Sequence, residues 1–203
     1  MSTLTEPEKK ILEAAKKVFE TEGFMGARMQ QIADETGISK ASLHYYFRSK
    51  EKLFEHIFED TMSEFLALVS TWEDDSEPWD EKLRKFVRQF FTFLSTKSLL
   101  FLIRESHRNP ELLLNWKRSM KSRKNRFIAY FEKLKADQKI RDLDIHVIFI
   151  FLHSLCAYPI LNKAMFKIST KLDEPDFDKL YADYPDHVAN FLIDILRTPS
   201  QHT

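Results

Sequence analysis

Glycine and cysteine are scarce in this chain of 203 residues, which contains three glycines and one cysteine. Tight strand hairpins and phosphate-binding loops both depend on glycine, because glycine adopts positive φ angles at little steric cost. Its scarcity therefore argues against both features and favours an all-helical fold. The single cysteine, Cys156, excludes an intramolecular disulfide and is typical of a reducing compartment.

The chain also lacks a long hydrophobic run. The first ten residues, Met1–Lys10, are polar and do not resemble a signal peptide. The most apolar run, Val147–Leu161, is interrupted by His153 and Pro159 and is too short to span a bilayer. The sequence therefore predicts a cytoplasmic protein that does not interact with a membrane.

Net charge is absent as well, since 31 lysines and arginines balance 31 aspartates and glutamates. This balance hides a strong segregation of charge along the chain. Residues 59–81 carry 9 acidic side chains and no basic one, whereas residues 82–141 carry 17 basic and 4 acidic side chains. Total charge therefore does not exclude a nucleic-acid partner.

Apolar residues recur at helical spacing through most of the chain, which predicts helices rather than strands. Thr5-Glu6-Pro7-Glu8 has the form of a capping box, and Gly23 is expected to end the helix that follows it. Further helices are predicted at about 29–36, 39–47, 49–72, 79–96, 98–108, 111–136, 143–170 and 184–197.

Two short helices joined by a glycine-containing turn are predicted near the N-terminus. Ile32 faces inward in the first helix, Gly37 permits the tight turn, and Ser39 caps the second helix. In the second helix, Leu43 and Phe47 lie one turn apart and define the buried side. This arrangement is the helix-turn-helix pattern, whose second helix typically enters the major groove of DNA.

The segment from Ile32 to Phe54, IADETGISKASLHYYFRSKEKLF, resembles the TetR family of bacterial regulators in residues and in spacing. The resemblance spans about the first quarter of the chain. It implies an all-α fold, with a three-helix DNA-binding domain at residues 1–49 and a larger helical domain at residues 50–203. The larger domain would bind a small-molecule effector and form a homodimer through the last two long helices. The implied DNA partner is a double-stranded palindromic operator, which the effector would release; repression is the habit of the family.

The side of the second short helix opposite Leu43 carries the residues expected to meet DNA. The small Ala41 permits close approach to a groove, and by the resemblance Lys40, His44 and Tyr45 face the bases beside it. Lys50 opens the next helix, where the helix dipole and its own charge favour a phosphate. The expected DNA contacts are Arg28, Gln30, Lys40, Ala41, Ser42, His44, Tyr45, Tyr46 and Lys50, with Tyr46 at a phosphate.

Two departures from the family pattern limit the prediction. The family commonly has Thr or Ser before the first short helix; here Ala27 and Arg28 stand there, so the cap is lost and Arg28 becomes the candidate phosphate contact. Where the family favours Gly-Thr and Tyr, this chain has Ala41, Ser42 and His44. The expected fold is unchanged, but the operator sequence cannot be predicted.

Other functions fit this sequence less well than DNA binding. A purely structural three-helix unit or a helical adaptor would not need the exposed Lys40, Tyr45 and Lys50. An enzyme is not expected, because the chain lacks a nucleophile elbow, a Walker loop, a dinucleotide fingerprint and a zinc-protease motif. No cofactor is expected for the same reason.

A metal site is disfavoured by the spacing of the histidines. His146 and His153 share a helix face but stand two turns apart, about 10 Å along the axis, too far to ligate one ion alone. His107 and Cys156 would join them only through tertiary contact. No metal is therefore expected.

The last helix presents one apolar stripe that a monomer is not expected to hide, which predicts an isologous dimer. The expected dimer interface is Val188, Phe191, Leu192 and Ile195.

The effector is expected to be hydrophobic, and an anionic group on it is one option. Arg123 and Lys124 flank the inward stripe of the helix predicted at about 111–136, and a buried cation needs a counter-anion. In the competing interpretation both side chains extend outward, and the basic run 117–126 is a solvated helix face. The expected effector contacts are Phe91, Trp116, Met120, Arg123, Lys124, Phe127, Phe149, Leu152 and His153.

Overall fold

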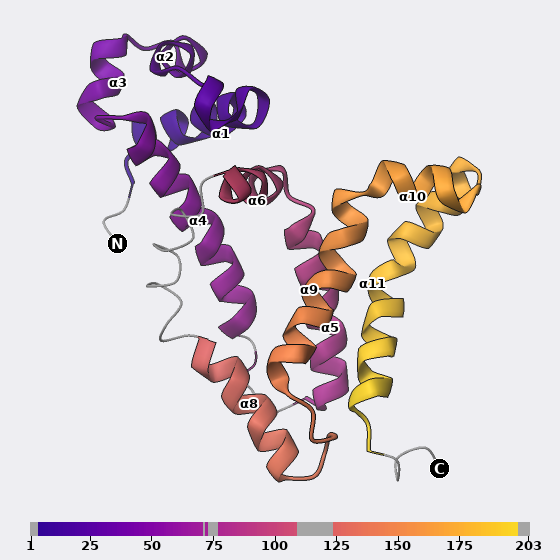
Figure 1. Cartoon of the computed structure of the whole chain (residues 1–203). Coiled ribbons are helices and arrows are strands. Elements are labelled where there is room, and N and C mark those ends of the chain that lie inside the picture. The colour runs from indigo at the N-terminus through magenta and orange to yellow at the C-terminus, as the bar shows by residue number, and fades with distance from the viewer. Residues whose placement is uncertain (1–3, 71, 73–76, 109–123, 199–203) are drawn as a thin grey trace. The chain divides into compact units, whose positions relative to one another are not determined.

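The computed structural model describes residues 4–70, 72, 77–108 and 124–198, and these residues contain helices and no strand. The predicted all-α class is therefore confirmed (Figure 1). The helices are α1 (Glu6–Gly26), α2 (Met29–Thr36), α3 (Lys40–Tyr46), α4 (Lys50–Ser70), α5 (Trp79–Leu94), α6 (Lys97–Arg108), α8 (Lys124–Ala136), α9 (Ile145–Leu161), α10 (Lys163–Thr170) and α11 (Glu174–Leu196).

Contacts between helices divide the chain into two units. The first unit takes Met1–Glu64 together with Thr96–Arg118, and the second takes Phe65–Ser95 together with Ser119–Thr203. Helix α4 therefore begins in one unit and ends in the other. The expected functional division after residue 49 stays a prediction.

Phenylalanine rings form the core of the first unit, where α1 packs against α2 and α6. Phe19 is fully buried and stacks on Phe101 with 5.8 Å between ring centroids. Phe54 meets Phe24 edge-on at 5.1 Å and Phe101 at 5.6 Å. Such ring pairs add roughly 0.5–1.5 kcal/mol each to the burial of apolar area, so this cluster holds α1, α4 and α6 together.

The ends of α1 follow the sequence prediction. The backbone N–H of Thr5 donates to Glu8 Oε2 at 2.7 Å, as in a capping box. Gly23 has φ +71°, outside the helical region, so the regular helix is interrupted there as expected. One further turn extends the element to Gly26.

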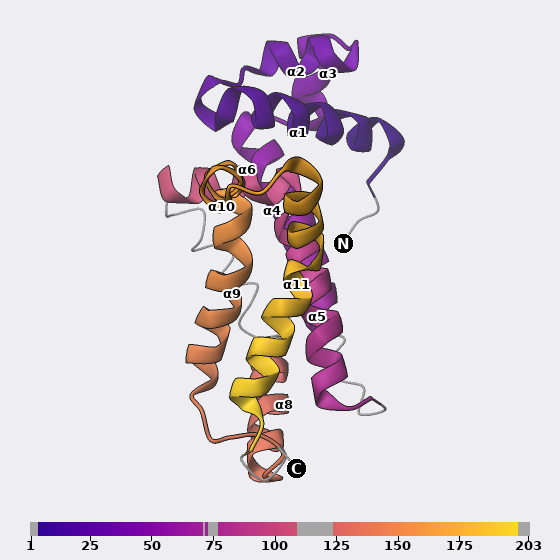
Figure 2. The ribbon, with the colours of Figure 1, turned by 90° about the vertical axis from the view of Figure 1, so that its right-hand side faces the viewer.

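In the second unit, α5 packs against both α9 and α11, and α9 also contacts α11 (Figures 1 and 2). Phe86, Val87 and Phe90 on α5 are buried in this contact region. Helix α9 is apolar nearly all round. In the described part of the chain, its buried side is the one that carries Ile148 and Leu152. Its opposite side exposes Val147, Ile150, Phe151, Tyr158 and Leu161.

Two helix boundaries differ from the sequence prediction. The single helix expected over 143–170 is broken at Asn162, whose φ of −118° and ψ of 24° separate α9 from α10. The last helix begins at Glu174 rather than near 184, because the Asp173 side chain caps it by accepting from Asp176 N at 3.0 Å. Pro185 was expected in the first turn of this helix but lies within it.

Prolines inside α9 and α11 leave backbone carbonyls without their usual helical donors, since proline has no N–H. Pro159 in α9 removes the donor for the Leu155 carbonyl. The hydroxyl of Tyr184 on α11 donates to that carbonyl at 3.1 Å. This bond ties α11 to α9 at the proline and satisfies a group that would otherwise be costly to bury.

Cys156 is fully buried on the inner side of α9. Burial raises the pKa of its thiol to about 12, because the charged thiolate would be desolvated there. The cysteine is thus a small apolar core residue in this fold.

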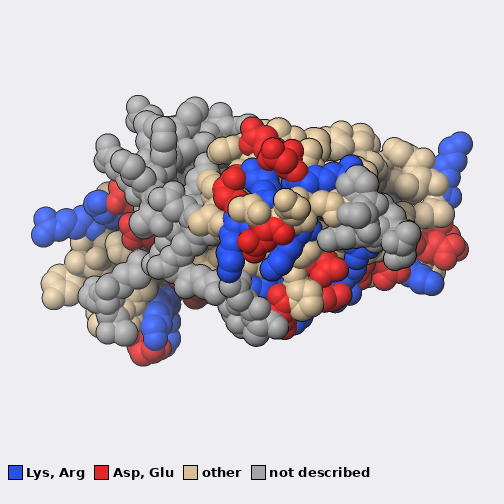
Figure 3. Space-filling view, turned by 90° about the horizontal axis from the view of Figure 1, so that it is seen from below, with Lys and Arg blue, Asp and Glu red and all other residues tan. Residues whose placement is uncertain are grey.

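Lysine and arginine side chains mix with acidic ones on the face seen from below (Figure 3). In the second unit, Lys135 pairs with Glu132 at 2.7 Å and Arg197 pairs with Asp80 at 3.2 Å. These two ion pairs lie at the surface of the second unit, and each such pair contributes little to stability. Most of the basic run 117–126 lies outside the described residues.

Among the described residues, no single helix is long and apolar enough to cross a membrane. Two bent helix pairs, Trp79–Leu94 with Leu99–Glu105 and Ile145–Leu161 with Lys163–Thr170, pass that test of length and composition only when each pair is taken together.

Candidate DNA-binding site

The turn between α2 and α3 is fixed by backbone geometry. Gly37 has φ +72°, a left-handed conformation that side chains other than glycine adopt at a cost. Its N–H donates to the Asp34 carbonyl at 3.2 Å, which closes the end of α2. Ser39 then caps α3, because its Oγ accepts from Ser42 N at 3.0 Å. The predicted glycine turn and serine cap are confirmed.

Helix α3 has one buried side and one exposed side. Leu43 is fully buried and Phe47, directly after the helix, is 3% exposed, as their spacing predicted. Tyr45 on the other side is 84% exposed, and its ring meets that of Tyr46 edge-on at 5.4 Å. The exposed side also carries Lys40, Ala41, Ser42 and His44.

The ring of His44 is oriented by a backbone contact. Its Nδ1 lies 3.1 Å from the Arg48 carbonyl oxygen. A carbonyl only accepts hydrogen bonds, so Nδ1 carries the proton in this contact, and Nε2 of the neutral ring is left as an acceptor. The exposed His44 therefore presents an acceptor to whatever lies against α3.

Lys50 has a position that the sequence did not reveal. It is the first residue of α4, and its Nζ donates to the Ala27 carbonyl at 3.1 Å and lies 4.6 Å from the centre of the Phe24 ring. The ammonium group thus holds the start of α4 against the segment that joins α1 to α2. Lys50 therefore has a structural role, in addition to the phosphate contact expected from its place at a helix N-terminus.

Replacing Lys50 with methionine is expected to lower the free energy of unfolding by about 1–2 kcal/mol, since a charge-assisted hydrogen bond and a cation–π contact are lost. Denaturant titration would measure the loss. Lys52→Met is the matched control, because Lys52 makes only an exposed ion pair with Glu55 and should change stability by less than about 0.5 kcal/mol. Equal stability of the Lys50→Met protein and the control would contradict the structural role.

The other expected contacts lie at the start of α2. Arg28 is exposed, and its backbone N–H donates to Gln31 Oε1 at 2.8 Å. Gln31 thereby supplies the half of a capping box in which the N3 side chain accepts from the N-cap backbone N–H. Gln30 is exposed, and its amide donates to Asp34 Oδ1 at 2.8 Å.

One exposed cation beside the motif was not predicted. Arg48 lies between α3 and α4, directly after the buried Phe47. The sequence feature that could have indicated Arg48 is its position in the short link between α3 and the N-terminus of α4, where a basic residue is close to a phosphate.

Residues 11–57 match the family model of bacterial regulatory proteins of the tetR family. The N-terminal region belongs to the TetR family. The transcriptional regulator RutR of Escherichia coli is 40% identical over 70 residues, which cover 34% of this chain. The transcriptional repressor NicS of Pseudomonas putida is 34% identical over 99 residues, or 44% of this chain. These matches span about a third of RutR and about half of NicS, 33% and 47% of their lengths.

The TetR-type fold extends beyond the matched region. The regulator FadR of Bacillus subtilis, solved with stearoyl-CoA, superposes with a TM-score of 0.68 at 19% identity, over 92% of this chain and 98% of FadR. The predicted architecture, a TetR-family helix-turn-helix domain followed by a larger helical region, is confirmed.

The described effector-contact residues form two groups in the second unit. The rings of Phe149 and His153 lie together, with centroids 4.1 Å apart. Leu152, which directly precedes His153 in the sequence of α9, is buried. Burial lowers the pKa of His153, although its contact with the Phe149 carbonyl opposes the shift. Phe91 instead meets Tyr181 on α11 at 5.5 Å. Trp116, Met120 and Arg123 lie outside the described residues, as do the side chains of Lys124 and Phe127.

A buried cation that the sequence did not single out lies on α5. Lys82 is 8% exposed, and its Nζ lies 4.8 Å from the centre of the Tyr130 ring. Within the described part of the chain its ammonium group has no hydrogen-bond acceptor. Lys82 stands one turn before the buried Phe86, and this spacing could have indicated from the sequence that Lys82 faces the core.

The expected dimer stripe on α11 is divided between two sides of the helix. Val188 and Leu192 are 3% and 0% exposed, because they pack in the core of their own chain. Phe191 is 52% exposed and Ile195 is partly exposed. Only the latter two remain accessible to a second copy, together with the exposed apolar side of α9.

Metal-ligating side chains do not cluster among the described residues, where no group of three or more His, Cys, Asp or Glu could hold an ion. His107 has no described side chain, so whether it joins Cys156 through tertiary contact is not tested.

Proposed function

We propose that this chain is a transcriptional regulator that binds a palindromic operator as a homodimer and leaves it when a small molecule occupies the second unit. Repression is the proposed mode of action. The observation that supports this proposal most directly is the arrangement of α3. Its Leu43 is buried in the region that matches the tetR family model, while Lys40, His44 and Tyr45 are exposed on the same helix. Relatives of this region are named as regulators, which favours this proposal over an enzyme.

The exposed side of α3 carries the proposed contacts with DNA. Tyr45 would contact base edges in the major groove, and the small Ala41 would let the helix approach closely. The free Nε2 acceptor of His44 fits an amino group, such as N4 of cytosine or N6 of adenine. Tyr46, Ser42, Gln30 and Lys40 complete the proposed contact surface.

Phosphate contacts would flank the reading helix. Arg28, directly before α2, and Arg48, between α3 and α4, are exposed cations. Lys50 donates to the Ala27 carbonyl at 3.1 Å and to the Met25 carbonyl at 3.5 Å, which leaves one N–H for a phosphate, and it lies at the positive end of the α4 dipole. Such contacts position a protein on DNA without reading its sequence.

The proposed homodimer rests on exposed apolar surface. Ile150, Phe151 and Tyr158 on α9 are 59%, 41% and 53% exposed, and Phe191 on the neighbouring α11 is exposed as well. Contiguous apolar surface of this kind is rare on monomers and marks an interaction site. A second copy of α9 and α11 supplies the same chemistry, as an isologous interface requires.

The proposed effector is hydrophobic, with the Phe149–His153 group as part of its surroundings. The ammonium group of Lys82, which has no hydrogen-bond acceptor among the described residues, supports an anionic group on the effector, because a buried cation is costly without a counter-charge. The contributions of Arg123 and Lys124 to such a site stay predictions.

Selection of bound DNA from a random pool tests the proposal. The same selection with the Tyr45→Ala protein tests whether Tyr45 contacts the bases. The wild type should enrich a palindrome with half-sites about 34 Å apart or a multiple of that distance. Tyr45→Ala should relax the preference at particular base pairs, at a cost of about 1–3 kcal/mol each.

The control for this experiment is Lys50→Met, which should weaken all sequences alike and lower the salt slope by about one unit. Enrichment of no sequence by the wild type would refute DNA recognition. A changed base preference for Lys50→Met with none for Tyr45→Ala would refute the placement of α3.

A further inference from the structure

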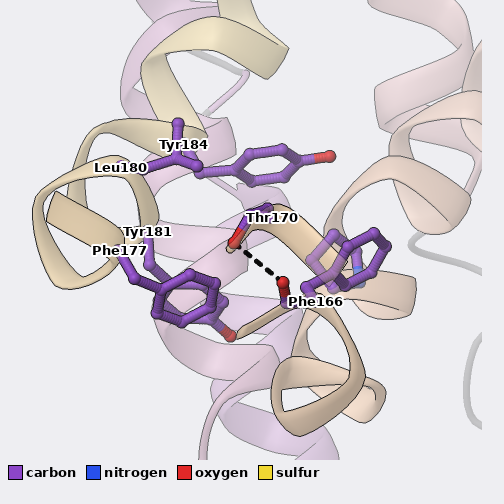
Figure 4. A pocket seen from close by; sticks show the side chains of 7 residues that line it. Phe166, Thr170, Phe177, Leu180, Tyr181 and Tyr184 are labelled. Carbon is purple, nitrogen blue, oxygen red and sulfur yellow. Dashed lines mark hydrogen bonds between the residues drawn. The ribbon is translucent and has the colours of Figure 1, made fainter. Parts of the chain in front are cut away.

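A cavity of about 110 Å³ lies between α9, α10 and α11 in the second unit (Figure 4). Four aromatic rings form most of its wall, and no lysine, arginine, aspartate or glutamate lines it. The lining residues are Pro159, Phe166, Thr170, Phe177, Leu180, Tyr181 and Tyr184.

Neighbouring contacts hold the walls in place. The Tyr184 hydroxyl is bound to the Leu155 carbonyl beside Pro159, so that this ring is fixed across the cavity. Tyr181 is braced from outside by Phe91, and Lys163 Nζ lies 4.3 Å from the centre of its ring. Thr170 closes one side, where its hydroxyl donates to the Phe166 carbonyl at 2.9 Å (Figure 4).

Helix α10 covers the cavity without burying any of its own residues. Asn162 and Lys171 bound this helix, and Lys171 has the left-handed φ of +55°. Helix α10 can shift to admit a ligand, because non-helical residues join it to the chain at both ends and none of its own residues is buried. The cavity is therefore both preformed and accessible.

Size and lining define the chemistry of an occupant. The space is partly open to solvent, since Thr170 and Leu180 are exposed, and an apolar guest would replace water against its walls. A dry apolar cavity of about 150 Å³ is known to bind benzene, which sets the scale for 110 Å³ at one ring. Aromatic walls favour an aromatic guest through edge-to-face contacts, and the lack of a charged lining residue disfavours an ion.

We infer that this cavity is a binding site for neutral, single-ring aromatic molecules. The site goes beyond the proposed function, because it shares no lining residue with the Phe149–His153 group and does not depend on DNA. The Tyr181 hydroxyl has no hydrogen-bond partner among the described residues and is available to a polar ring substituent.

The test uses the full chain without DNA and toluene as the probe, with binding followed by ligand-observed NMR and by the rise in Tm. Toluene should bind saturably and raise Tm with concentration, because it stabilises only the folded state. Naphthalene and benzoate should bind at least tenfold more weakly, since one is too large and the other is charged.

Thr170→Met places a longer side chain in the cavity and should weaken toluene binding at least tenfold. Ser169→Met is the matched control, because Ser169 is the preceding residue of α10, makes the same kind of bond to the Met165 carbonyl, and does not line the cavity. Leu180→Phe fills the cavity from α11 and should have the effect of Thr170→Met.

The inference is overturned if wild-type protein does not bind toluene, which includes the case in which a second copy fills the cavity with its own side chain. It is also overturned if both filled variants, folded as judged by Tm, bind toluene as tightly as the Ser169→Met protein.

Discussion

A chain with alanine in place of Phe54 is expected to lose about 3–5 kcal/mol of stability, the usual cost of removing a fully packed aromatic ring. Phe54 is 2% exposed and meets the rings of Phe19, Phe24 and Phe101 with centroids no more than 6.1 Å apart. The cavity left behind would separate α4 from α1 and α6. Denaturant titration followed by circular dichroism measures this loss.

Specific DNA binding should disappear with the fold of the first unit in the Phe54→Ala protein. Tyr45→Ala is the control, because its ring is 84% exposed and should change the free energy of unfolding by less than about 0.5 kcal/mol. A Phe54→Ala protein that unfolds at the same denaturant concentration as the control would show that this ring cluster does not hold the unit together.

Charge on the exposed apolar surface is expected to turn the proposed dimer into a monomer. In an isologous interface each substitution occurs twice, so Ile150→Asp together with Phe191→Asp would bury four carboxylates without partners. Sedimentation at micromolar concentration should give a dimer for the wild type and a monomer for this variant. Operator affinity should fall by about 10²–10⁴-fold, because two linked reading helices bind far more tightly than one.

The control for the dimer is Asn190→Asp, which adds the same charge next to Phe191. Asn190 Oδ1 already accepts from Arg84 at 2.7 Å, so a carboxylate there is paired within its own chain and should leave the dimer intact. A monomeric wild type would refute the dimer. A doubly substituted protein that stays dimeric would refute the surface assigned to it.

The helix-turn-helix of the first unit could be predicted from sequence because local patterns determine it. Gly37 supplies the turn, Ser39 the cap and Leu43 the buried side, and each acts within a few residues of itself. The bond from Lys50 to the Ala27 carbonyl was not predictable, because it joins residues 23 positions apart. Helix periodicity carries no information about such a contact.

The second unit was harder to predict because its helices are apolar on more than one side. Val188 and Leu192 face the core of their own chain while Phe191 is exposed, although the sequence joins them in one stripe. A proline is typical of the first turn of a helix, but in α11 Pro185 stands about three turns after the cap at Asp173. The aromatic cavity was not predicted, because three helices contribute its walls.

The burial of Cys156 has a consequence for signalling by oxidants. Thiol oxidation and disulfide exchange begin with the thiolate, and a pKa of about 12 leaves only roughly one thiol in 10⁵ ionised at pH 7. Cys156 is also the only cysteine of the chain and so has no resolving partner within it. Peroxide and disulfide stress should therefore leave this sulfur unchanged, so Cys156 is not suited to sense oxidants.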